Sequence, residues 1–180
     1  EAGELDNARA HFLNALALAE ALTDESAIAF TCNSLGIVAG RQSDGVAARQ
    51  WLARASAGFA RLGNQLQAET VRSNEAALLT TIGDHAGAIE AGEQALAFFR
   101  QVQHTRMIAA TAASIADACI NLGRLDQARG MAELVIAQEE TQFVPYALYT
   151  LAEVRIAEGQ PAAAAEPLND GLRLARQNHD

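Results

Sequence analysis

Glycine recurs in this sequence at an interval that restricts how the chain can fold. Gly3, Gly83 and Gly123 are spaced by multiples of 40 residues. Ser43 fills the missing place in this series, and Gly159 follows 36 residues after the third glycine. Glycine is favoured just after a helix because it adopts left-handed backbone angles without a Cβ clash. A period of this length predicts an array of helical hairpins, each burying its apolar face against its neighbours.

The stretches between these turns carry apolar residues at spacings of three and four, as amphipathic helices do. We expect nine helices, at about 4–22, 25–41, 45–62, 65–82, 85–102, 105–122, 125–139, 143–158 and 161–178. The joins are short, so successive helices should be antiparallel neighbours. The predicted fold class is therefore all-α, an α-α superhelix of antiparallel hairpins. We expect one domain, 1–180, with a half repeat at 1–22 and repeats at about 24–63, 64–103, 104–140 and 141–180.

The first expected helix has no preceding partner, which predicts that the chain is a piece of a longer protein. Its apolar residues Leu5, Phe12 and Leu16 should be left partly uncovered, because a terminal repeat normally carries a polar cap. An uncapped helix of this kind can pair with a copy of itself. A homodimer through this helix is therefore a further expectation.

Two irregularities lie in the C-terminal third. The last interval of the glycine series is four residues short, about one helical turn, and we expect that turn to be missing between Val135 and Tyr146. Pro167 falls inside the last expected helix, where proline removes a hydrogen bond and costs about 3 kcal/mol. We therefore predict that the final helix is kinked or frayed, whereas Pro161 suits a first helical position.

The charge balance argues against a nucleic-acid partner. The chain carries 22 acidic residues against 13 arginines, with no lysine and a net charge of −9, whereas binding to phosphates favours a basic stripe. Arg54 and Arg61 lie in a stretch without acids and are expected to pair with Glu90 and Glu93 on the next outer helix. No apolar run reaches the roughly 20 residues of a membrane span. We expect no membrane partner and a cytoplasmic location.

No arrangement of reactive side chains predicts catalysis. His11, His85, His104 and His179 are isolated, without a histidine or cysteine at metal-ligand spacing. His85 and His104 are expected at surface turns. Two cysteines are too few for a disulfide framework, so we expect Cys32 and Cys119 to be buried, reduced thiols. The prediction is a protein that is not an enzyme, with no catalytic residue, no metal site and no cofactor.

Small residues recur in register with the turns. Aligning the turn positions superposes the alanines Ala8, Ala48, Ala88, Ala128 and Ala164. The first helices of the hairpins carry a large apolar residue followed by a small one at 35–36, 115–116 and 151–152. With these positions the chain resembles the tetratricopeptide repeat family, in its longer, roughly 40-residue form. Glu75–Ala76 breaks the pattern, so the second repeat is either shifted or carries an acid at a normally packed site.

In that family the first helices of successive repeats line a concave groove that faces the ligand. The resemblance therefore implies that polar and aromatic residues on these helices contact a ligand. Carried over by register, the implied ligand-binding residues are Phe30, Asn33, Ser34, Ser73, Asn74, Ser114, Asp117, Tyr146, Tyr149 and Thr150. Hydroxyl and amide groups can bond the backbone of an extended peptide without requiring a charge, and aromatic residues often carry interface energy.

The resemblance implies a scaffold that binds a peptide or a partner helix in this groove. The acidic chain favours a neutral to basic partner. An alternative stays open, because the GxLDxAR sequences at 3–9 and 123–129 are similar to C-terminal arrays of bacterial signal-transduction ATPases and LuxR-type transcriptional activators. That likeness implies an effector-sensing or regulatory domain, with nucleotide and DNA bound by other domains.

Overall fold

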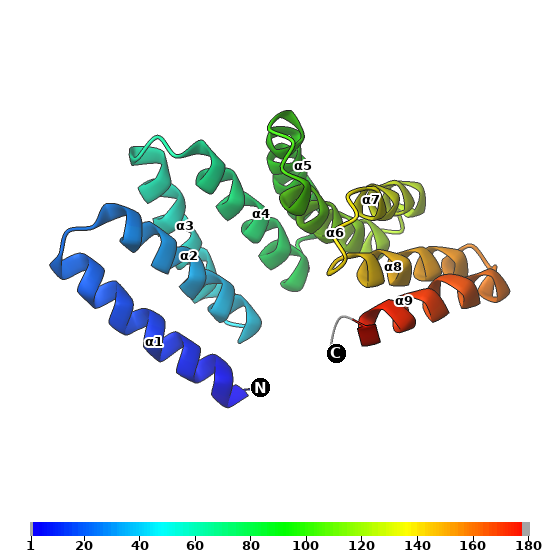
Figure 1. Ribbon diagram of the computed structural model, residues 1–180, viewed down its shortest axis with the longest axis horizontal. Helices are drawn as coiled ribbons and strands as arrows, with labels where there is room; N and C mark the ends of the chain where they lie inside the picture. Colours follow the sequence, from blue (N-terminus) through cyan, green and yellow to red (C-terminus); the bar gives the residue numbers. More distant parts are fainter. Residues whose placement is uncertain (1, 178–180) are drawn as a thin grey trace. The chain divides into compact units, whose positions relative to one another are not determined.

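The structure, a computed structural model, describes residues 2–177, and these residues form helices joined by short links (Figure 1). The elements are α1 (Ala2–Ala21), α2 (Glu25–Arg41), α3 (Gly45–Arg61), α4 (Gln65–Thr81), α5 (His85–Gln101), α6 (Thr105–Asn121), α7 (Leu125–Ala137), α8 (Val144–Ala157), a 3-10 helix η1 (Pro161–Ala164) and α9 (Ala165–Gln177). No strand occurs between residues 2 and 177. The all-α prediction is confirmed, and α1 to α8 begin and end within two residues of the predicted bounds.

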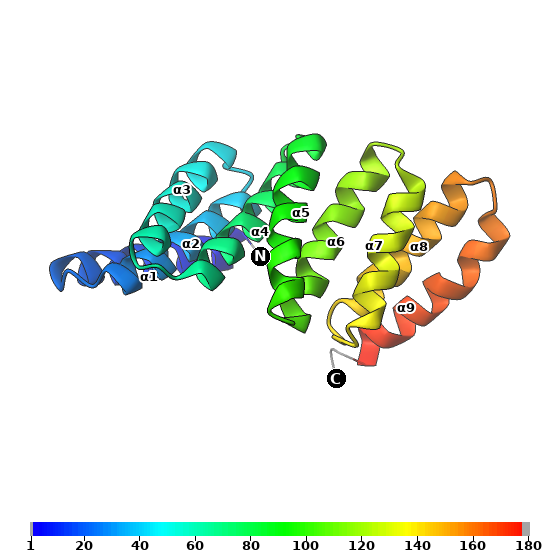
Figure 2. The same cartoon turned by 90° about the horizontal axis from the view of Figure 1, so that it is seen from above.

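Contacts between helices divide the chain into two compact units, 1–83 and 84–180. The first unit contains α1 to α4 and the second contains α5 to α9 (Figure 2). Within each unit, every helix packs against the next one along the chain. In addition, α4 contacts α2 and α8 contacts α6, so each of these helices lies against both helices of the preceding hairpin. The prediction of a single domain stays a prediction.

The links between helices share one backbone feature. A residue with a left-handed conformation, φ between 54° and 86°, follows each of α1 to α8. These residues are Thr23, Ser43, Gly63, Gly83, Gln103, Gly123, Glu139 and Gly159. They recur every 20 residues apart from one interval of 16, so the period is one helix and its link. Gly3 does not belong to the series, because it lies inside α1.

In the links after α1 to α4, the residue after the left-handed one is the N-cap of the next helix. The side chains of Asp24, Asp44, Asn64 and Asp84 each accept a hydrogen bond from the backbone N–H three residues on, at 2.9–3.2 Å. Such caps satisfy N–H groups that have no partner within the helix. The backbone N–H of Asp24, Asp44 and Asn64 also bonds the carbonyl five residues earlier, which satisfies a terminal carbonyl of the preceding helix. One three-residue link thus closes two helix ends.

The missing turn lies at the end of α7. That helix has 13 residues, whereas each of α2 to α6 has 17. The next left-handed residue, Glu139, accordingly follows Gly123 after 16 residues rather than 20. The structure therefore places the lost turn inside the predicted interval.

The last segment differs from the prediction of one helix over 161–178. It begins with the 3-10 turn of η1, and α9 starts only at Ala165. Pro167 is the third residue of α9, within the first turn, where N–H groups lack α-helical partners. Because α9 begins after the 3-10 turn, Pro167 avoids the destabilisation expected for a proline in a helix interior. Residue 178 lies outside the described residues.

The cores of both units are built mainly from alanine and medium-sized aliphatic residues. In the first unit the core joins α1 to α4 around Leu16, Leu35, Leu52 and Phe59. Leu16, which we expected to be partly uncovered, is buried. Leu5 and Phe12 are half-buried, as expected, and the exposed leucines of α1 are Leu13 and Leu18. Both cysteines, Cys32 and Cys119, are buried free thiols, as predicted.

Glu75 does not mark a shift of register in α4. The neighbouring Ala76 is fully buried, as are Ala116 and Ala152 at the equivalent positions. The Glu75 side chain itself is exposed. The second repeat therefore keeps its register, and its acid does not enter the core.

The close approach of α2 and α3 depends on two glycines. A Cβ added to Gly58 would lie 2.8 Å from the Cβ of Ala29, and one added to Gly36 would lie 2.7 Å from the side chain of Leu52. Both distances are shorter than van der Waals contact. Hydrogen in place of a side chain therefore sets how closely these helices pack.

Arg54 and Arg61 of α3 pair with acidic residues, but not with the predicted ones. Arg54 pairs with Glu20 of α1 at 2.5 Å, and Arg61 pairs with Glu25 of α2 at 3.2 Å. The expected pairing with Glu90 and Glu93 is therefore wrong. These pairs are exposed, so each contributes little to stability.

We predict opposite effects for two glycine-to-alanine changes. Gly58→Ala lowers the free energy of unfolding by about 1 kcal/mol or more, because the new methyl group meets the rigid Cβ of Ala29. Gly130→Ala, in the middle of α7, raises it by about 0.5–1 kcal/mol, because its Cβ points into open space. Urea titrations followed by circular dichroism measure both. Equal stabilisation by the two changes would contradict the close contact of α2 and α3.

The left-handed positions generate a second prediction. Gln103→Gly stabilises the second unit by about 0.5–1 kcal/mol, because its φ of 55° strains a residue with a Cβ. Gly123→Gln, the reverse change one module later, destabilises by a similar amount. Thermal unfolding of the two variants measures the difference, and a destabilised Gln103→Gly variant would contradict it.

Candidate functional site

Two of the implied ligand-binding residues bond to each other in the first unit. The side-chain amide of Asn74, on α4, donates to Oδ1 of Asn33, on α2, at 2.8 Å. Both side chains are half-buried. The bond leaves the Asn74 oxygen and one or more Asn33 amide hydrogens for other partners. The pair is therefore a polar bridge between two helices with capacity to bond a ligand.

The other implied residues of the first unit pack against, or bond to, neighbouring protein groups and differ in how far they are exposed. The ring of Phe30 packs edge-on against buried Phe59, with centroids 4.9 Å apart, although 44% of Phe30 is exposed. The Ser34 hydroxyl donates to the carbonyl of Phe30 in the same helix. Ser73 is only 5% exposed. We therefore leave Ser73 out of the candidate surface and retain Phe30, Asn33 and Asn74.

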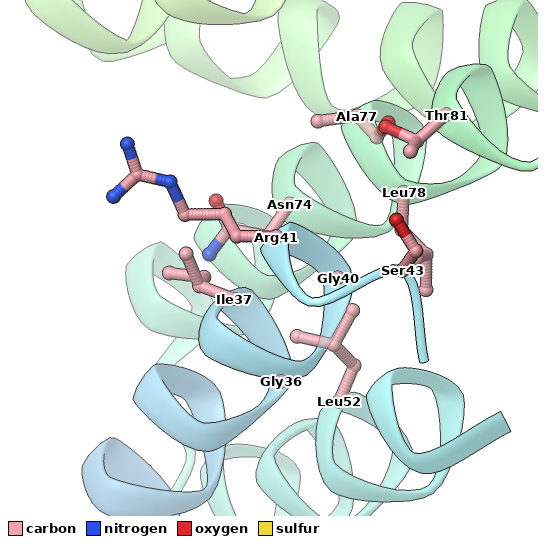
Figure 3. A pocket seen from close by; sticks show the side chains of 10 residues that line it. All are labelled: Gly36, Ile37, Gly40, Arg41, Ser43, Leu52, Asn74, Ala77, Leu78 and Thr81. Carbon is pink, nitrogen blue, oxygen red and sulfur yellow. The ribbon is translucent and has the colours of Figure 1, made fainter. Parts of the chain in front are cut away.

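A small pocket lies beside this polar bridge. It has a volume of about 260 Å³ and is lined by residues of α2, α3 and α4, with Leu52, Leu78 and Asn74 among them. Figure 3 shows Leu52 on the α3 side and the Arg41 guanidinium extending away from it. The pocket is smaller than the roughly 300–1,000 Å³ usual for ligand sites, and its lining includes the apolar side chains of Leu52 and Leu78. It gives a limited binding surface on its own.

A second set of implied residues meets in the second unit. The hydroxyl of Tyr146, on α8, donates to Oδ2 of Asp117, on α6, at 2.5 Å. Burial raises the pKa of Asp117, while the Tyr146 hydrogen bond and the charge of His85 act against that rise. Burial, followed by the bond to Asp117, raises the pKa of Tyr146 well above its usual range. The two groups thus form a firm, partly buried contact between α6 and α8.

Tyr149 lies one turn further along α8 and is the more accessible of the two tyrosines. The nearby negative charge of Glu153 raises its pKa. Exposed fractions are 51% for Tyr149 and 45% for Tyr146. Ser114, in contrast, donates to the carbonyl of Ala110 in its own helix, and Thr150 is only 1% exposed. Of these four residues, Tyr146 and Tyr149 therefore have the side-chain surface that a ligand could contact.

Both tyrosines line an apolar groove between α8 and α9. The groove has a volume of about 450 Å³, and its remaining walls include Pro145, Leu168, Leu172 and Ala175. Leu172 is 56% exposed. Large apolar side chains exposed together in a hollow are typical of interaction sites. This groove is the strongest candidate site in the described chain.

The groove differs from the implied site in the residues of its second wall. Leu168, Leu172 and Ala175 belong to α9, which the family register does not place on the ligand-facing side. The signal was present in the sequence, because Leu168, Leu172 and Ala175 recur at spacings of four and three on one helix face.

The remaining reactive side chains do not gather into a site. Between residues 2 and 177, no three His, Cys, Asp or Glu side chains lie together in a way that could hold a metal ion. His104 caps α6 by accepting a hydrogen bond from the Met107 N–H at 3.4 Å, and His179 lies outside the described residues. Burial raises the pKa of the Cys119 thiol to about 11, which disfavours a reactive thiolate.

Comparison with known proteins adds no identity. No family model matches the chain, and no curated protein matches its sequence. Among the described residues, no helix combines the length and apolar character required to cross a bilayer.

The Tyr146–Asp117 bond gives a spectroscopic prediction. Tyr146 and Tyr149 are the only tyrosines, so phenolate absorbance in an alkaline titration reports on both. We expect both to ionise above the usual pH of 10, with Tyr146 the later of the two. Asp117→Asn should lower the pKa of Tyr146, because it removes a carboxylate that favours the protonated phenol. Asp126→Asn, on α7 and paired with Arg129, is the matched control and should change nothing.

The same bond predicts a pH dependence of stability. Because the folded state holds the Tyr146 proton more tightly than the unfolded state, the free energy of unfolding falls as pH rises above about 10. Tyr146→Phe should weaken this dependence. An unchanged alkaline profile in that variant would contradict the raised pKa.

Proposed function

We propose that this chain is a non-catalytic protein-interaction module that binds a neutral to basic peptide segment or partner helix at the groove between α8 and α9. The observation that carries the proposal is the exposure of Tyr146, Tyr149 and Leu172 around one apolar hollow. Tyrosine and other aromatic residues are enriched among the side chains that contribute most to protein interfaces.

The charges around the groove favour a basic partner. Asp117 and Glu153 both lie close enough to the two phenols to influence their pKa values. The chain as a whole has a net charge of −9. Acidic groups at the border of an apolar site attract basic partners and orient them, and this effect weakens as salt rises.

The polar bridge of the first unit supplies a secondary surface under this proposal. Asn33 and Asn74 offer amide groups, and Phe30, three residues before Asn33 on α2, is partly exposed. These groups can bond a peptide backbone. The resemblance to tetratricopeptide arrays agrees with the proposal, since it also implies a peptide ligand.

A selection experiment tests the proposed function. A phage-displayed library of random peptides is panned against the wild-type chain, with counter-selection against Leu172→Glu, which places a charge in the groove. We expect enriched peptides rich in Leu, aromatic and basic residues that bind the wild-type chain with micromolar affinity and lose at least tenfold in the variant.

Leu18→Glu is the matched control. Leu18 is 63% exposed on α1 and Leu172 is 56% exposed on α9, so the two changes cost the fold similarly little. Binding that survives Leu172→Glu, or a library that yields no enriched peptide, would refute the proposal. Circular dichroism verifies that both variants remain helical.

A further inference from the structure

The pocket between α2 and α4 lies where two glycines take the place of side chains. Gly36 and Gly40 are one helical turn apart on α2, so they share a face of the helix, and both line the pocket. Leu52 of α3 packs so closely on Gly36 that a Cβ there would clash at 2.7 Å. A Cβ on Gly40 would lie 3.5 Å from Leu78 of α4, which is ordinary contact. Gly40 therefore leaves open a space that a side chain could occupy.

Other repeats carry larger side chains at the position of Gly40. A shift by one and by two 40-residue periods places it at Thr80 of α4 and Ile120 of α6. Glycine inside a helix is destabilising relative to alanine. Close packing against Leu52 accounts for Gly36, but no close contact requires glycine at position 40. What glycine provides at position 40 is space in the pocket.

The walls of the pocket combine apolar side chains with hydrogen-bonding groups. Ile37, Leu52 and Leu78 supply the apolar part, and Ile37 is 41% exposed. The Asn74 amide donates one hydrogen to Asn33 and keeps a second for another partner. None of the described residues that line the pocket is acidic. A ligand with an apolar body and a group that accepts hydrogen bonds matches these walls.

Arg41, the last residue of α2, stands at the rim of the pocket. It is exposed, and no acidic side chain between residues 2 and 177 forms an ion pair with it. Asp44, close by in sequence, accepts a hydrogen bond from the Ala47 N–H instead. Figure 3 shows the guanidinium directed away from the pocket, and turning it inward breaks no ion pair. A guanidinium pairs best with a carboxylate, often through two hydrogen bonds.

The helix end at this rim does not prevent an anion from binding. The C-terminal carbonyls of a helix carry partial negative charge, which opposes an anion. In α2 the backbone N–H groups of Gln42, Ser43 and Asp44 donate to carbonyls of the last turn and reduce this effect. The Ser43 side chain also lines the pocket, and its hydroxyl can donate a hydrogen bond. The charge of Arg41 is therefore the main electrostatic feature of the rim.

We propose that the pocket between α2 and α4 binds a small organic acid, with its carboxylate on Arg41 and its hydrocarbon part against Leu52 and Leu78. The volume of about 260 Å³ equals that of about nine water molecules in the liquid, so the acid has fewer than about ten non-hydrogen atoms. This site lies in the first unit and does not depend on the groove between α8 and α9. It gives the chain a small-molecule site in addition to the proposed peptide site.

Three six-carbon probes test this inference on the intact chain. They are hexanoate, hexan-1-ol and hexylammonium, which share a hydrocarbon part and differ in the charge of the head group. We expect hexanoate to bind with a Kd below about 1 mM, at least tenfold more tightly than the other two, and more weakly as salt rises. Amide chemical shifts in two-dimensional NMR titrations measure the affinities, and the largest changes should fall in α2 and α4.

Two sets of variants assign the binding to the pocket. Arg41→Gln should weaken hexanoate at least tenfold, while Arg49→Gln, an exposed arginine of α3 outside the pocket, leaves it unchanged. Gly40→Ala, whose Cβ fits without a clash, should weaken hexanoate several-fold. Gly40→Ile, which introduces the residue found at the equivalent position of α6, should abolish binding. Gly130→Ala is the matched control, and thermal unfolding verifies that each variant is folded.

Three results would overturn the inference. They are hexan-1-ol binding as tightly as hexanoate, hexanoate binding that survives Arg41→Gln or Gly40→Ile, and no hexanoate binding up to about 10 mM. A carboxylate can also come from the end of a peptide. If an acetylated peptide ending in leucine binds over tenfold more tightly than hexanoate, and its amidated form does not bind, the ligand is a chain end and the free acid is wrong.

The groove variant keeps this test separate from that of the proposed function. Leu172→Glu should leave hexanoate binding unchanged, because Leu172 belongs to the second unit and does not line this pocket. Failure of hexanoate to bind would leave the peptide groove standing, and failure of the peptide selection would leave this pocket standing. Hexanoate binding that is lost in Leu172→Glu would contradict the assignment to the first unit.

Discussion

The three-residue link between helices is the feature on which the rest of this structure depends. One residue turns the backbone into the left-handed region, and the next caps the following helix, so two sets of otherwise unpaired backbone groups are satisfied together. Because α2 to α6 have equal lengths, the apolar stripes of successive helices start in the same phase. This arrangement requires left-handed backbone angles, which are strained for residues with a Cβ, at Thr23, Ser43, Gln103 and Glu139.

Helices with small side chains at their contacts pack closely. Gly36 and Gly58 show the limit of this approach, since even one methyl group would clash there. Several large apolar side chains, such as Leu18 and Val46, are nevertheless exposed, and Tyr146, Tyr149 and Leu172 differ from these two in lining one apolar groove. The candidate site is therefore distinguished by the groove that these residues share and not by their exposure alone.

Much of the fold could be predicted because local chemistry determines it. Helix ends followed from the 3.6-residue period and from turn residues, and they agree to within two residues for α1 to α8. The glycine series is an incomplete guide to the turns, because Gly63 is left-handed and Gly3 lies inside a helix, and residue type alone does not distinguish the two. The left-handed conformations of Thr23 and Gln103 could not be predicted, because neither residue type favours a positive φ.

The site was less predictable, because it depends on which side chains the packing leaves uncovered. Tyr146 and Tyr149 were found by register, yet Ser73 and Thr150 from the same register are buried. The partners of Arg54 and Arg61 were also misassigned, because they lie on the preceding helices rather than on α5. Burial and ion-pair partners of this kind depend on tertiary contacts between helices, which a single sequence does not specify directly.

The short α7 shows how a chain of this design can change its length. Each residue advances the helix by about 100° around its axis, so the loss of four residues removes a rotation of about 400°. The residues after the deletion are then only about 40° away from their original direction. Loss of two residues would rotate the stripe to the opposite face and expose the core. Viable insertions and deletions in this architecture should therefore come in whole turns, which makes helix length a quantised variable in the divergence of such proteins.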